Sequence, residues 1–445
     1  MFKKISKLFI FITLFFFSVL LIADEVTNEN VRGESIEYLE NIITPNITSD
    51  NSEHTLEAPK SLWKRIEAGF KLESQENKRE QDYLNWYQSR PEYVERMIER
   101  SSKYLYHVVE EVEKRNMPME IALLPMIESA YNPVAKSRQK AVGMWQFIAS
   151  TGRLYGLEQN WWQDKRRNVI QSTSAALDYL EKLHQTFGSW ELALAAYNAG
   201  EGRIKRAIIK NTKRKHKTDY YSLDLPRETK NYVPKLLAVK KIIMEPEKFQ
   251  LFIQNIPDTP YFKVVNIPDE IDAVVAANMA KISLEEFQSL NPEHNRPLLK
   301  AKFNTQDILL PINAVETFKE NLEKNTNSLT QWIIYEPTKG EKVSQVAKKF
   351  GIDIKELIKI NQLKSNENLK NKIILIPNSP EALNNYPIST ENLYSYSTIV
   401  THKVKNGETL SRIAKKYNIP LKDLMEFNEL KSTKIIVDSY IDIPK

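Results

Sequence analysis

The sequence has no cysteine among its 445 residues. Disulfide bonds, thiolate chemistry and a lipid-modified N-terminal cysteine are therefore excluded. The six histidines are scattered without the spacing of a metal site, so we predict neither a metal nor another cofactor. No basic run is interleaved with aromatic residues and no nucleic-acid motif occurs, so we predict no nucleic-acid partner.

A strong charge of one sign is also lacking. The 63 basic and 57 acidic residues leave a net charge of +6. A weakly basic surface suits an anionic polymer or a membrane surface, but it also suits ordinary solubility. The apolar fraction of 42% is that of a globular protein, and the length is enough for two or three domains. Composition says nothing about the oligomeric state.

The N-terminal apolar run, residues 8–23, is short for a membrane-spanning helix and follows three lysines at positions 3, 4 and 7. This pattern is typical of a signal peptide. Leu21 stands where a cleavage site favours a small residue, so an uncleaved N-terminal anchor stays an alternative. We predict a signal peptide or anchor over residues 1–23 and an exported protein. Residues 24–59, rich in Asn, Glu, Ser and Thr, predict a flexible tether.

The region from residue 60 to 250 shows helical periodicity and no convincing alternating strand between 118 and 245. Apolar residues recur at helical spacing, with Glu, Lys and Arg on the other face. Gly188 follows one such segment as a candidate C-cap, and Ser189 precedes the next as a candidate N-cap. The region is predicted to be a compact, mainly helical domain.

The C-terminal part contains a repeat. ISLEEFQSLN (282–291), IDIKELIKIN (352–361) and IPLKDLMEFN (419–428) share one pattern that ends in Asn, and each precedes a short strand-like stretch that ends in Pro. The Asn and the Pro are 16 residues apart in the last two copies and 20 in the first, which is divergent. A second helical stretch precedes each of the last two copies. We predict units of strand, helix, helix and strand.

One carboxylate stands in an apolar run, LLPMIESAYNP at residues 123–133, where Glu128 is the only charged residue. Burial disfavours a carboxylate, so its pKa should be raised, as a general acid requires. The alternative is a buried Glu paired with a cation such as Lys136 or Arg138. None of the other acidic residues between 118 and 235 has so apolar a setting; they are Glu120, Glu158, Asp164, Asp178, Glu181, Glu191, Glu201, Asp219, Asp224 and Glu228.

Three later segments combine aromatic rings with amides or prolines: GMWQF (143–147), AYNAG (196–200) and PRETKNYVP (226–234). Rings stack on sugar faces, and amides bond hydroxyl and N-acetyl groups, so such a set suits a sugar-binding cleft. Each segment alone reads as core or as a helix end. Their occurrence in this order after the Glu-Ser pair is much more specific.

With these motifs and the Trp161–Trp162 pair, the chain resembles the lytic transglycosylases that have a goose-type lysozyme-like catalytic domain, over nearly all of residues 60–445. The repeats resemble LysM modules, which bind the N-acetylglucosamine-containing backbone of peptidoglycan and chitin. The resemblance implies a mainly α catalytic domain followed by small α+β (βααβ) modules. The expected boundaries are 60–250 for the catalytic domain, 260–315 for a divergent LysM-like unit, 331–378 and 399–445 for LysM modules, and 379–398 for a linker.

The resemblance also implies roles for single residues. Glu128 would be the catalytic acid and base, and Ser129 would support the site by hydrogen bonding. Met144 and Gln146 would line the cleft, Tyr197 and Asn198 would contact the muramyl residue, and Tyr232 would orient the substrate. In the third LysM unit, the candidate glycan-binding residues are Gly407, Glu408, Thr409, Leu410, Ile419 and Asn428. The second unit has Lys342 where the third has Thr409.

An ordinary glycosidase uses two carboxylates, whereas the resemblance implies one. Glu128 would protonate the glycosidic oxygen, the substrate's N-acetyl group would stabilise the cationic centre, and Glu128 would then deprotonate the muramyl C6 hydroxyl to close a 1,6-anhydro ring. The implied partner is the peptidoglycan strand, in the periplasm or cell envelope, with membrane association through the N-terminus open. Two alternatives stay open: a hydrolysing muramidase, and a non-catalytic peptidoglycan-binding protein.

Overall fold

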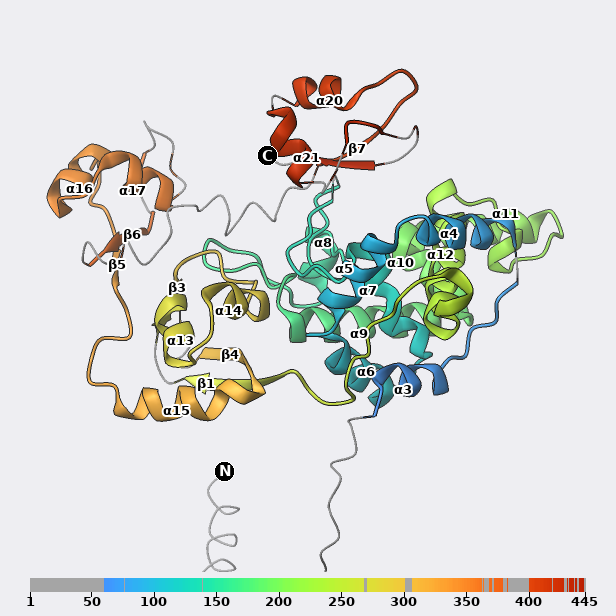
Figure 1. Cartoon of the computed structure of the whole chain (residues 1–445), viewed down its shortest axis with the longest axis horizontal. Coiled ribbons are helices and arrows are strands. Elements are labelled where there is room, and N and C mark those ends of the chain that lie inside the picture. The colour runs from blue at the N-terminus through green and yellow to red at the C-terminus, as the bar shows by residue number, and fades with distance from the viewer. Residues whose placement is uncertain are drawn as a thin grey trace, which may run out of the picture. The chain divides into compact units, whose positions relative to one another are not determined.

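The computed structural model of this chain is shown in Figure 1. It describes residues 60–443 except for 76, 138, 268–269, 301–305, 362, 364–367, 370–371, 379–381, 383–399, 418, 428–429, 431, 436 and 438–439. The predicted signal segment (1–23), tether (24–59) and linker (379–398) therefore lie outside the described residues, apart from residue 382. Among the described helices, we find none with the length and hydropathy of a membrane span.

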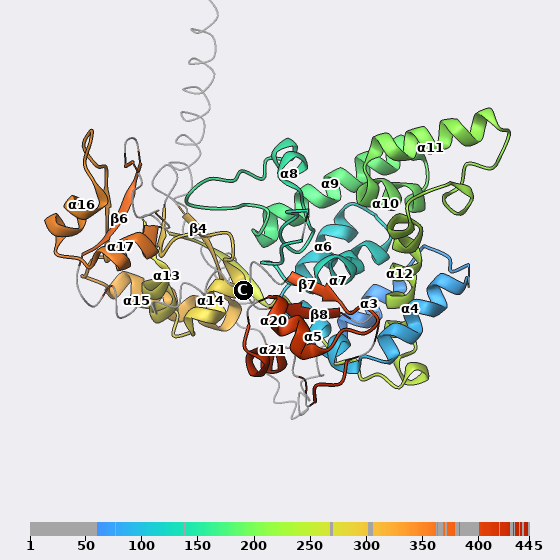
Figure 2. The same ribbon diagram turned by 90° about the horizontal axis from the view of Figure 1, so that it is seen from above.

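The first part of the described chain is a helical domain around one large hydrophobic core (Figures 1 and 2). Its helices are α3 (Leu62–Ala68), α4 (Lys78–Gln88), α5 (Pro91–Ser101), α6 (Leu105–Lys114), η1 (Met119–Leu123), α7 (Leu124–Ser129), α8 (Ala149–Leu154), α9 (Val169–Phe187), α10 (Trp190–Ala199), α11 (Glu201–Lys213), η2 (Tyr220–Ser222), α12 (Arg227–Met244) and η3 (Pro246–Phe249). α12 packs against α4, α7 and α10. The mainly helical fold class is confirmed.

Local sequence signals set the ends of the two helices that lead to the site. α9 begins after Asn168, whose side chain accepts a hydrogen bond from the amide of Gln171, and it ends at Gly188 with φ of 71°. Ser189 caps α10 by accepting from the amide of Leu192. Both predicted caps are confirmed. A left-handed Gly next to a capping Ser turns the chain sharply between two helices.

Three small units follow, each with its own hydrophobic core. The first contains β1 (Phe262–Ile267), β2 (Ile271–Asp272), α13 (Ala273–Met279), α14 (Leu284–Leu290), β3 (Leu298–Leu299), β4 (Gln306–Pro311), η4 (Ile312–Ala314) and α15 (Val315–Lys324). The second contains β5 (Trp332–Tyr335), α16 (Val343–Phe350), α17 (Ile354–Asn361) and β6 (Ile374–Pro377), and the third β7 (Val400–Lys403), α20 (Leu410–Lys416), α21 (Leu421–Phe427) and β8 (Tyr440–Ile443). The first and last strands of each unit pair antiparallel, which confirms the βααβ arrangement.

The asparagine that ends the repeat holds the unit together in the first two copies. Asn291 exchanges two hydrogen bonds with the backbone of Leu309, at 2.8 and 2.9 Å. Asn361 does the same with Leu375, at 2.7 and 2.9 Å. Each asparagine is almost fully buried and ties the end of the second helix to the last strand. The repeat pattern therefore has a structural cause, because a buried backbone group needs a partner.

Candidate active site

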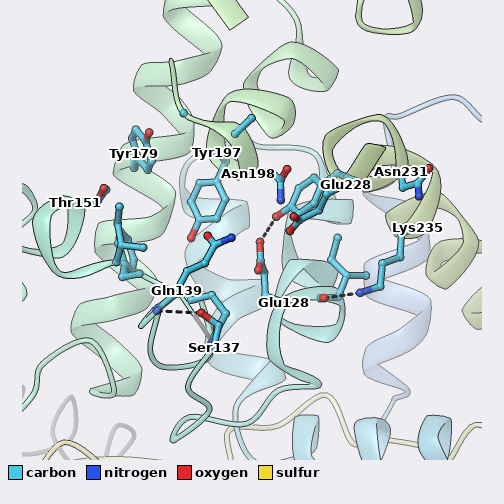
Figure 3. A pocket seen from close by; sticks show the side chains of 18 of the residues that line it. Glu128, Ser137, Gln139, Thr151, Tyr179, Tyr197, Asn198, Glu228, Asn231 and Lys235 are labelled. Carbon is cyan, nitrogen blue, oxygen red and sulfur yellow. Dashed lines mark hydrogen bonds between the residues drawn. The ribbon is translucent and has the colours of Figure 1, made fainter. Parts of the chain in front are cut away.

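A cavity of about 580 Å³ opens in the helical domain (Figure 3). That volume lies in the usual range for ligand pockets. The residues that line it come from α4, α7, the loop after α7, α8, α9, α10 and α12. They are Tyr83 of α4 and Ile127, Glu128, Ser137, Gln139, Ala141, Gln146, Phe147, Ile148, Thr151, Tyr179, Tyr197, Asn198, Ala199, Gly200, Glu228, Asn231, Tyr232 and Lys235.

Glu128 lies in the last turn of α7, and the backbone turns sharply behind it. Ala130 and Tyr131 have φ of 52° and 57°, in the left-handed region that non-glycine residues rarely adopt. The buried Tyr131 donates its hydroxyl to the carbonyl oxygen of Ala122 at 2.7 Å, and this bond holds the turn. Such strain persists only where the surrounding structure enforces it, and it occurs often at functional sites. The turn fixes the direction in which Glu128 leaves the helix.

The carboxyl group of Glu128 is held by a phenol. The hydroxyl of Tyr232, on α12, donates a hydrogen bond to Oε1 of Glu128. Burial raises the pKa of Glu128 to about 7, while the Tyr232 hydrogen bond and the charge of Lys235 act in the opposite direction. The described residues give Glu128 no salt bridge; Lys136 forms none with it, and Arg138 lies outside the described part. A carboxyl group that is protonated near neutrality can donate a proton.

Two further side chains on α12 face the same cavity, and the sequence analysis missed both. Lys235 donates its amine to the carbonyl oxygen of Ile127 at 2.7 Å, and burial lowers its pKa. Glu228 lines the cavity and its charge raises the pKa of Glu128. The signal that could have found them is helical spacing, because positions 228, 232 and 235 are four and three residues apart and share one face. Glu228 was set aside because its neighbours in the sequence are polar.

The GMWQF loop forms the wall beside Glu128, and it needs glycine at one position. Gly143 has φ of 89°, and a Cβ there would meet the carbonyl oxygen of Arg166 at 2.0 Å. Trp145 is fully buried and donates to Oγ1 of Thr173 at 3.0 Å. Gln146 lines the cavity, with its amide nitrogen 2.8 Å from the carbonyl oxygen of Gly143. The loop thus presents an amide to the cavity on a rigid support.

Met144 does not line the cleft, contrary to the expectation from the sequence. The Met144 side chain is 1% exposed and belongs to the hydrophobic core. Gln146, two residues further along the same loop, lines the cavity instead. The hydroxyl of Ser129 donates to the carbonyl oxygen of Met144 at 2.9 Å and accepts from the amide of Asn132 at 3.1 Å. Ser129 therefore ties α7 to the loop, and it is not among the residues that line the cavity.

Tyr197 and Asn198, at the end of α10, are placed in the cavity wall. The hydroxyl of Tyr197 donates to the carbonyl oxygen of Trp145 at 2.7 Å, which joins α10 to the GMWQF loop. The amide oxygen of Asn198 accepts from the hydroxyl of Thr229 on α12 at 2.9 Å. The structure thus brings Glu128, Gln146, Tyr197, Asn198 and Tyr232 together around one cavity.

The candidate glycan-binding residues of the third unit lie in different settings. Leu410 is fully buried and Ile419 packs against the same core, so these two side chains support the unit. Glu408 accepts hydrogen bonds from the amide of Lys405 and from His402, while Thr409 caps α20. Gly407 is exposed with φ of 81°. Asn428 lies outside the described residues.

No group of three or more His, Cys, Asp or Glu side chains converges among the described residues.

Comparison with known proteins agrees with this arrangement. The model of the "Transglycosylase SLT domain" family matches residues 106–220, that of the "LysM domain" matches 338–370 and 402–444, and that of the "Lytic transglycosylase MltD, LysM-like domain" matches 261–327. The chain is 32% identical to membrane-bound lytic murein transglycosylase D of Escherichia coli K12 over 379 residues, which is 82% of each chain. This chain belongs to the lytic transglycosylase family.

Two shorter matches fall in the same range of identity. A putative tributyltin chloride resistance protein of an Alteromonas species is 40% identical over 36% of this chain and 76% of its own length. Peptidoglycan transglycosylase gp16 of Escherichia phage T7 is 35% identical over 26% of this chain and 8% of its own length. The segment that matches the SLT domain family, residues 106–220, contains Glu128, Gln146, Tyr197 and Asn198. Tyr232 lies after this segment.

Proposed function

We propose that this protein is a peptidoglycan lytic transglycosylase that cleaves the β-1,4 bond between N-acetylmuramic acid and N-acetylglucosamine and leaves a 1,6-anhydromuramyl end. The observation that carries the proposal is Glu128, a carboxyl group with a pKa of about 7, held by Tyr232 in a cavity lined by amides and aromatic rings. Membership of the lytic transglycosylase family supports the same activity. The wall substrate requires a protein of the cell envelope.

Glu128 performs two proton transfers in the proposed reaction. The protonated acid gives its proton to the glycosidic oxygen as the bond to the muramyl C1 breaks, and the substrate's N-acetyl oxygen stabilises the cationic centre. The carboxylate then takes the proton of the C6 hydroxyl as that oxygen bonds to C1. A pKa near the working pH serves both steps, since one group must first donate and then accept.

The other residues of the cavity position the sugars. Gln146 and Asn198 offer amides to the N-acetyl and hydroxyl groups, and Tyr197 offers a ring at the cleavage point. Tyr232 holds the carboxyl group through its hydroxyl. Ser129 acts through the backbone of the GMWQF loop.

A hydrolysing muramidase is the second candidate, because Glu228 also lines the cavity. Two carboxylates flanking the bond would allow water to be activated as in ordinary glycosidases. We favour the transglycosylase because Glu228 is exposed, and the described part of the chain gives its side chain no hydrogen-bond or ion-pair partner, whereas Glu128 has Tyr232. The products separate the two, since hydrolysis leaves a reducing end.

Mass spectrometry of the sugars released from purified sacculi tests the proposal, with Glu128→Gln as the inactive control. Anhydromuropeptides from the wild type alone support a transglycosylase. Reducing muropeptides that disappear in Glu228→Gln support the muramidase. The absence of product from every protein would favour a binding protein without catalytic activity.

The organisation along the chain is part of the proposal. We propose export by residues 1–23, a tether over 24–59, a catalytic domain over 60–250, LysM modules over 331–378 and 399–445, and a linker over 379–398. The first LysM-like unit extends beyond residue 315 in this proposal, because Val315 and Phe318 of α15 belong to its core. Glycan binding by the modules, and anchoring to a membrane by residues 8–23, are proposed on the resemblance alone.

A further inference from the structure

The strongest local charge in the chain lies on α11 and the loop that follows it. Residues 203–218 contain eight Arg or Lys and no acid, although the whole chain has a net charge of only +6. The rest of the chain is therefore slightly acidic. All eight cationic side chains are exposed; they are Arg203, Lys205, Arg206, Lys210, Lys213, Arg214, Lys215 and Lys217.

Most of these cations share one face of the helix. Positions 203, 206, 210, 213 and 214 follow the three- and four-residue spacing of a single stripe, opposite the buried Ile204. Like charges at this spacing destabilise a helix, so the arrangement does not serve the stability of α11. Two of the eight cations form salt bridges, Lys205 with Glu201 and Lys210 with Asp224. The described residues give the other six no ion pair.

The loop that carries the last cations has a defined structure. Asn211 is 5% exposed and donates its amide to the carbonyl oxygens of Lys217 at 2.8 Å and Ser222 at 3.0 Å. Its own carbonyl oxygen accepts from the amides of Arg214 and His216. One buried asparagine thus folds the basic loop against the end of α11. The cations are presented on a built surface and do not lie on a loose tail.

This cationic surface, residues 203–217, begins at the rim of the catalytic cavity. Asn198 and Gly200 line the cavity, and α11 starts at the next residue, Glu201. The salt bridge from Lys210 reaches Asp224, four residues before Glu228, which lines the cavity on the α12 side. Figure 2 shows α11 running outward from the end of α10 at the edge of the helical domain. A helix of this length extends about 20 Å from the rim.

We propose that the cationic surface of α11 binds the carboxylates of the stem peptides on the same glycan strand whose sugars enter the cavity. The inference rests on the proposed function and adds the peptide-bearing substrate to it. A peptidoglycan strand leaving the cavity carries peptides with free carboxylates at regular intervals. The cations on α11 run from Arg203 to Lys213, about 15 Å by the helical rise, so the array can reach more than one of these peptides. Exposed charges of opposite sign raise the local concentration of a substrate and its rate of association.

The test compares two substrates and two full-length variants. The substrates are intact sacculi and glycan strands stripped of their peptides by an amidase. The variant Arg203→Gln/Arg206→Gln/Lys213→Gln/Arg214→Gln removes charge with good helix formers. The matched control, Arg203→Lys/Arg206→Lys/Arg214→Lys, keeps the charge. Formation of anhydromuramyl ends gives kcat/KM, and pelleting with sacculi in the Glu128→Gln background gives binding without cleavage.

We expect the glutamine variant to lose about tenfold in kcat/KM on sacculi at low salt, within the range of electrostatic steering. The difference should shrink in 0.5 M salt, where the Debye screening length is only about 4 Å. On stripped strands it should equal the wild type, and the lysine control should equal the wild type on both. Weaker pelleting of the glutamine variant should accompany the loss.

Three results would overturn the inference. Wild-type rates and pelleting of the glutamine variant on sacculi would show that the surface binds no substrate. An equal loss on both substrates would show an effect on the cavity itself. Loss of binding to phosphatidylglycerol vesicles, with sacculi unaffected, would assign the surface to a membrane. If the wild type makes no anhydromuramyl ends from either substrate, the proposed function fails. Pelleting with sacculi would then still decide whether the cationic surface binds the stem peptides.

Discussion

Two acidic residues in one short stretch of chain, Glu120 on η1 and Glu128 on α7, have different surroundings. Glu120 is fully buried, pairs with Lys240 at 2.7 Å and accepts from the amide of Leu72 at 2.8 Å. Glu128 faces a cavity, and a phenol is its hydrogen-bond donor. Both face α12, which supplies Lys240 to the first and Tyr232 to the second. A buried carboxylate with a cation and amides is costly to disrupt, whereas burial without a cation raises the pKa of Glu128 and lets that group carry a proton near neutrality.

The largest expected effect is the loss of activity in Glu128→Gln. Glutamine keeps the shape but has no proton to give and accepts none, so we expect kcat to fall at least about 10³-fold, within the range for general acid–base groups. The measurement is the rate of anhydromuropeptide release, with circular dichroism to show an intact fold. Turnover within tenfold of the wild type would remove Glu128 from the mechanism.

Glu120→Gln should give the opposite result, a loss of stability without loss of chemistry. The change leaves the partly buried Lys240 without its carboxylate but with its hydrogen bond to the carbonyl oxygen of Leu72. Breaking a fully buried pair typically costs about 3–5 kcal/mol, so we expect a loss of about 2–3 kcal/mol in the free energy of unfolding. Urea unfolding measures the cost, and kcat per folded molecule should stay within about twofold of the wild type. Lys248→Gln, which breaks an exposed pair with Glu245, is the matched control and should cost less than about 1 kcal/mol.

Glu128→Gln should also differ from the wild type in how its stability depends on pH. The pKa of Glu128 is raised from 4.5 to about 7 on folding, so the folded protein holds more protons between these values and loses stability as pH rises through them. Glu128→Gln lacks this loss, so its stability relative to the wild type should rise by about 3 kcal/mol between pH 4.5 and pH 8. Thermal unfolding at pH 4.5 and pH 8 measures the difference, and an equal offset at both would contradict it.

Two single changes should move the pH profile in opposite directions. The general acid must be protonated, so kcat/KM should fall as pH rises past about 7. Tyr232→Phe removes a hydrogen bond that lowers the pKa of Glu128, so the fall in kcat/KM should move to higher pH. The lost bond should also reduce the maximal kcat/KM about tenfold. Glu228→Gln removes a negative charge and should move it to lower pH. Shifts of the same sign would refute this account.

The last expected effect comes from the far end of the chain and depends on the substrate. Deleting residues 399–445 removes a unit with its own core and should lower activity on sacculi about tenfold, because tethering raises the local concentration of substrate. Activity on soluble fragments should not change. The measurement is the ratio of the two rates, and a parallel fall on both substrates would mean that the unit supports the fold.

The sequence by itself determined the class of fold, the repeat and the central acid. Helical periodicity, the Gly188–Ser189 pair and the three Asn-terminated repeats are local patterns, and local physics suffices to interpret them. Glu128 stood out because its neighbours along the chain are apolar.

The tertiary structure decided which groups face Glu128 and which residues only support the site. Glu120 was set aside because its setting in the sequence is less apolar than that of Glu128, yet it is fully buried and pairs with Lys240, 120 residues away along the chain. Met144 points into the core although the resemblance placed it in the cleft. Lys235 and Glu228 reach the cavity only because α12 packs against α7. A pKa depends on burial and on charges brought from distant segments, and neither is a property of neighbours in the sequence.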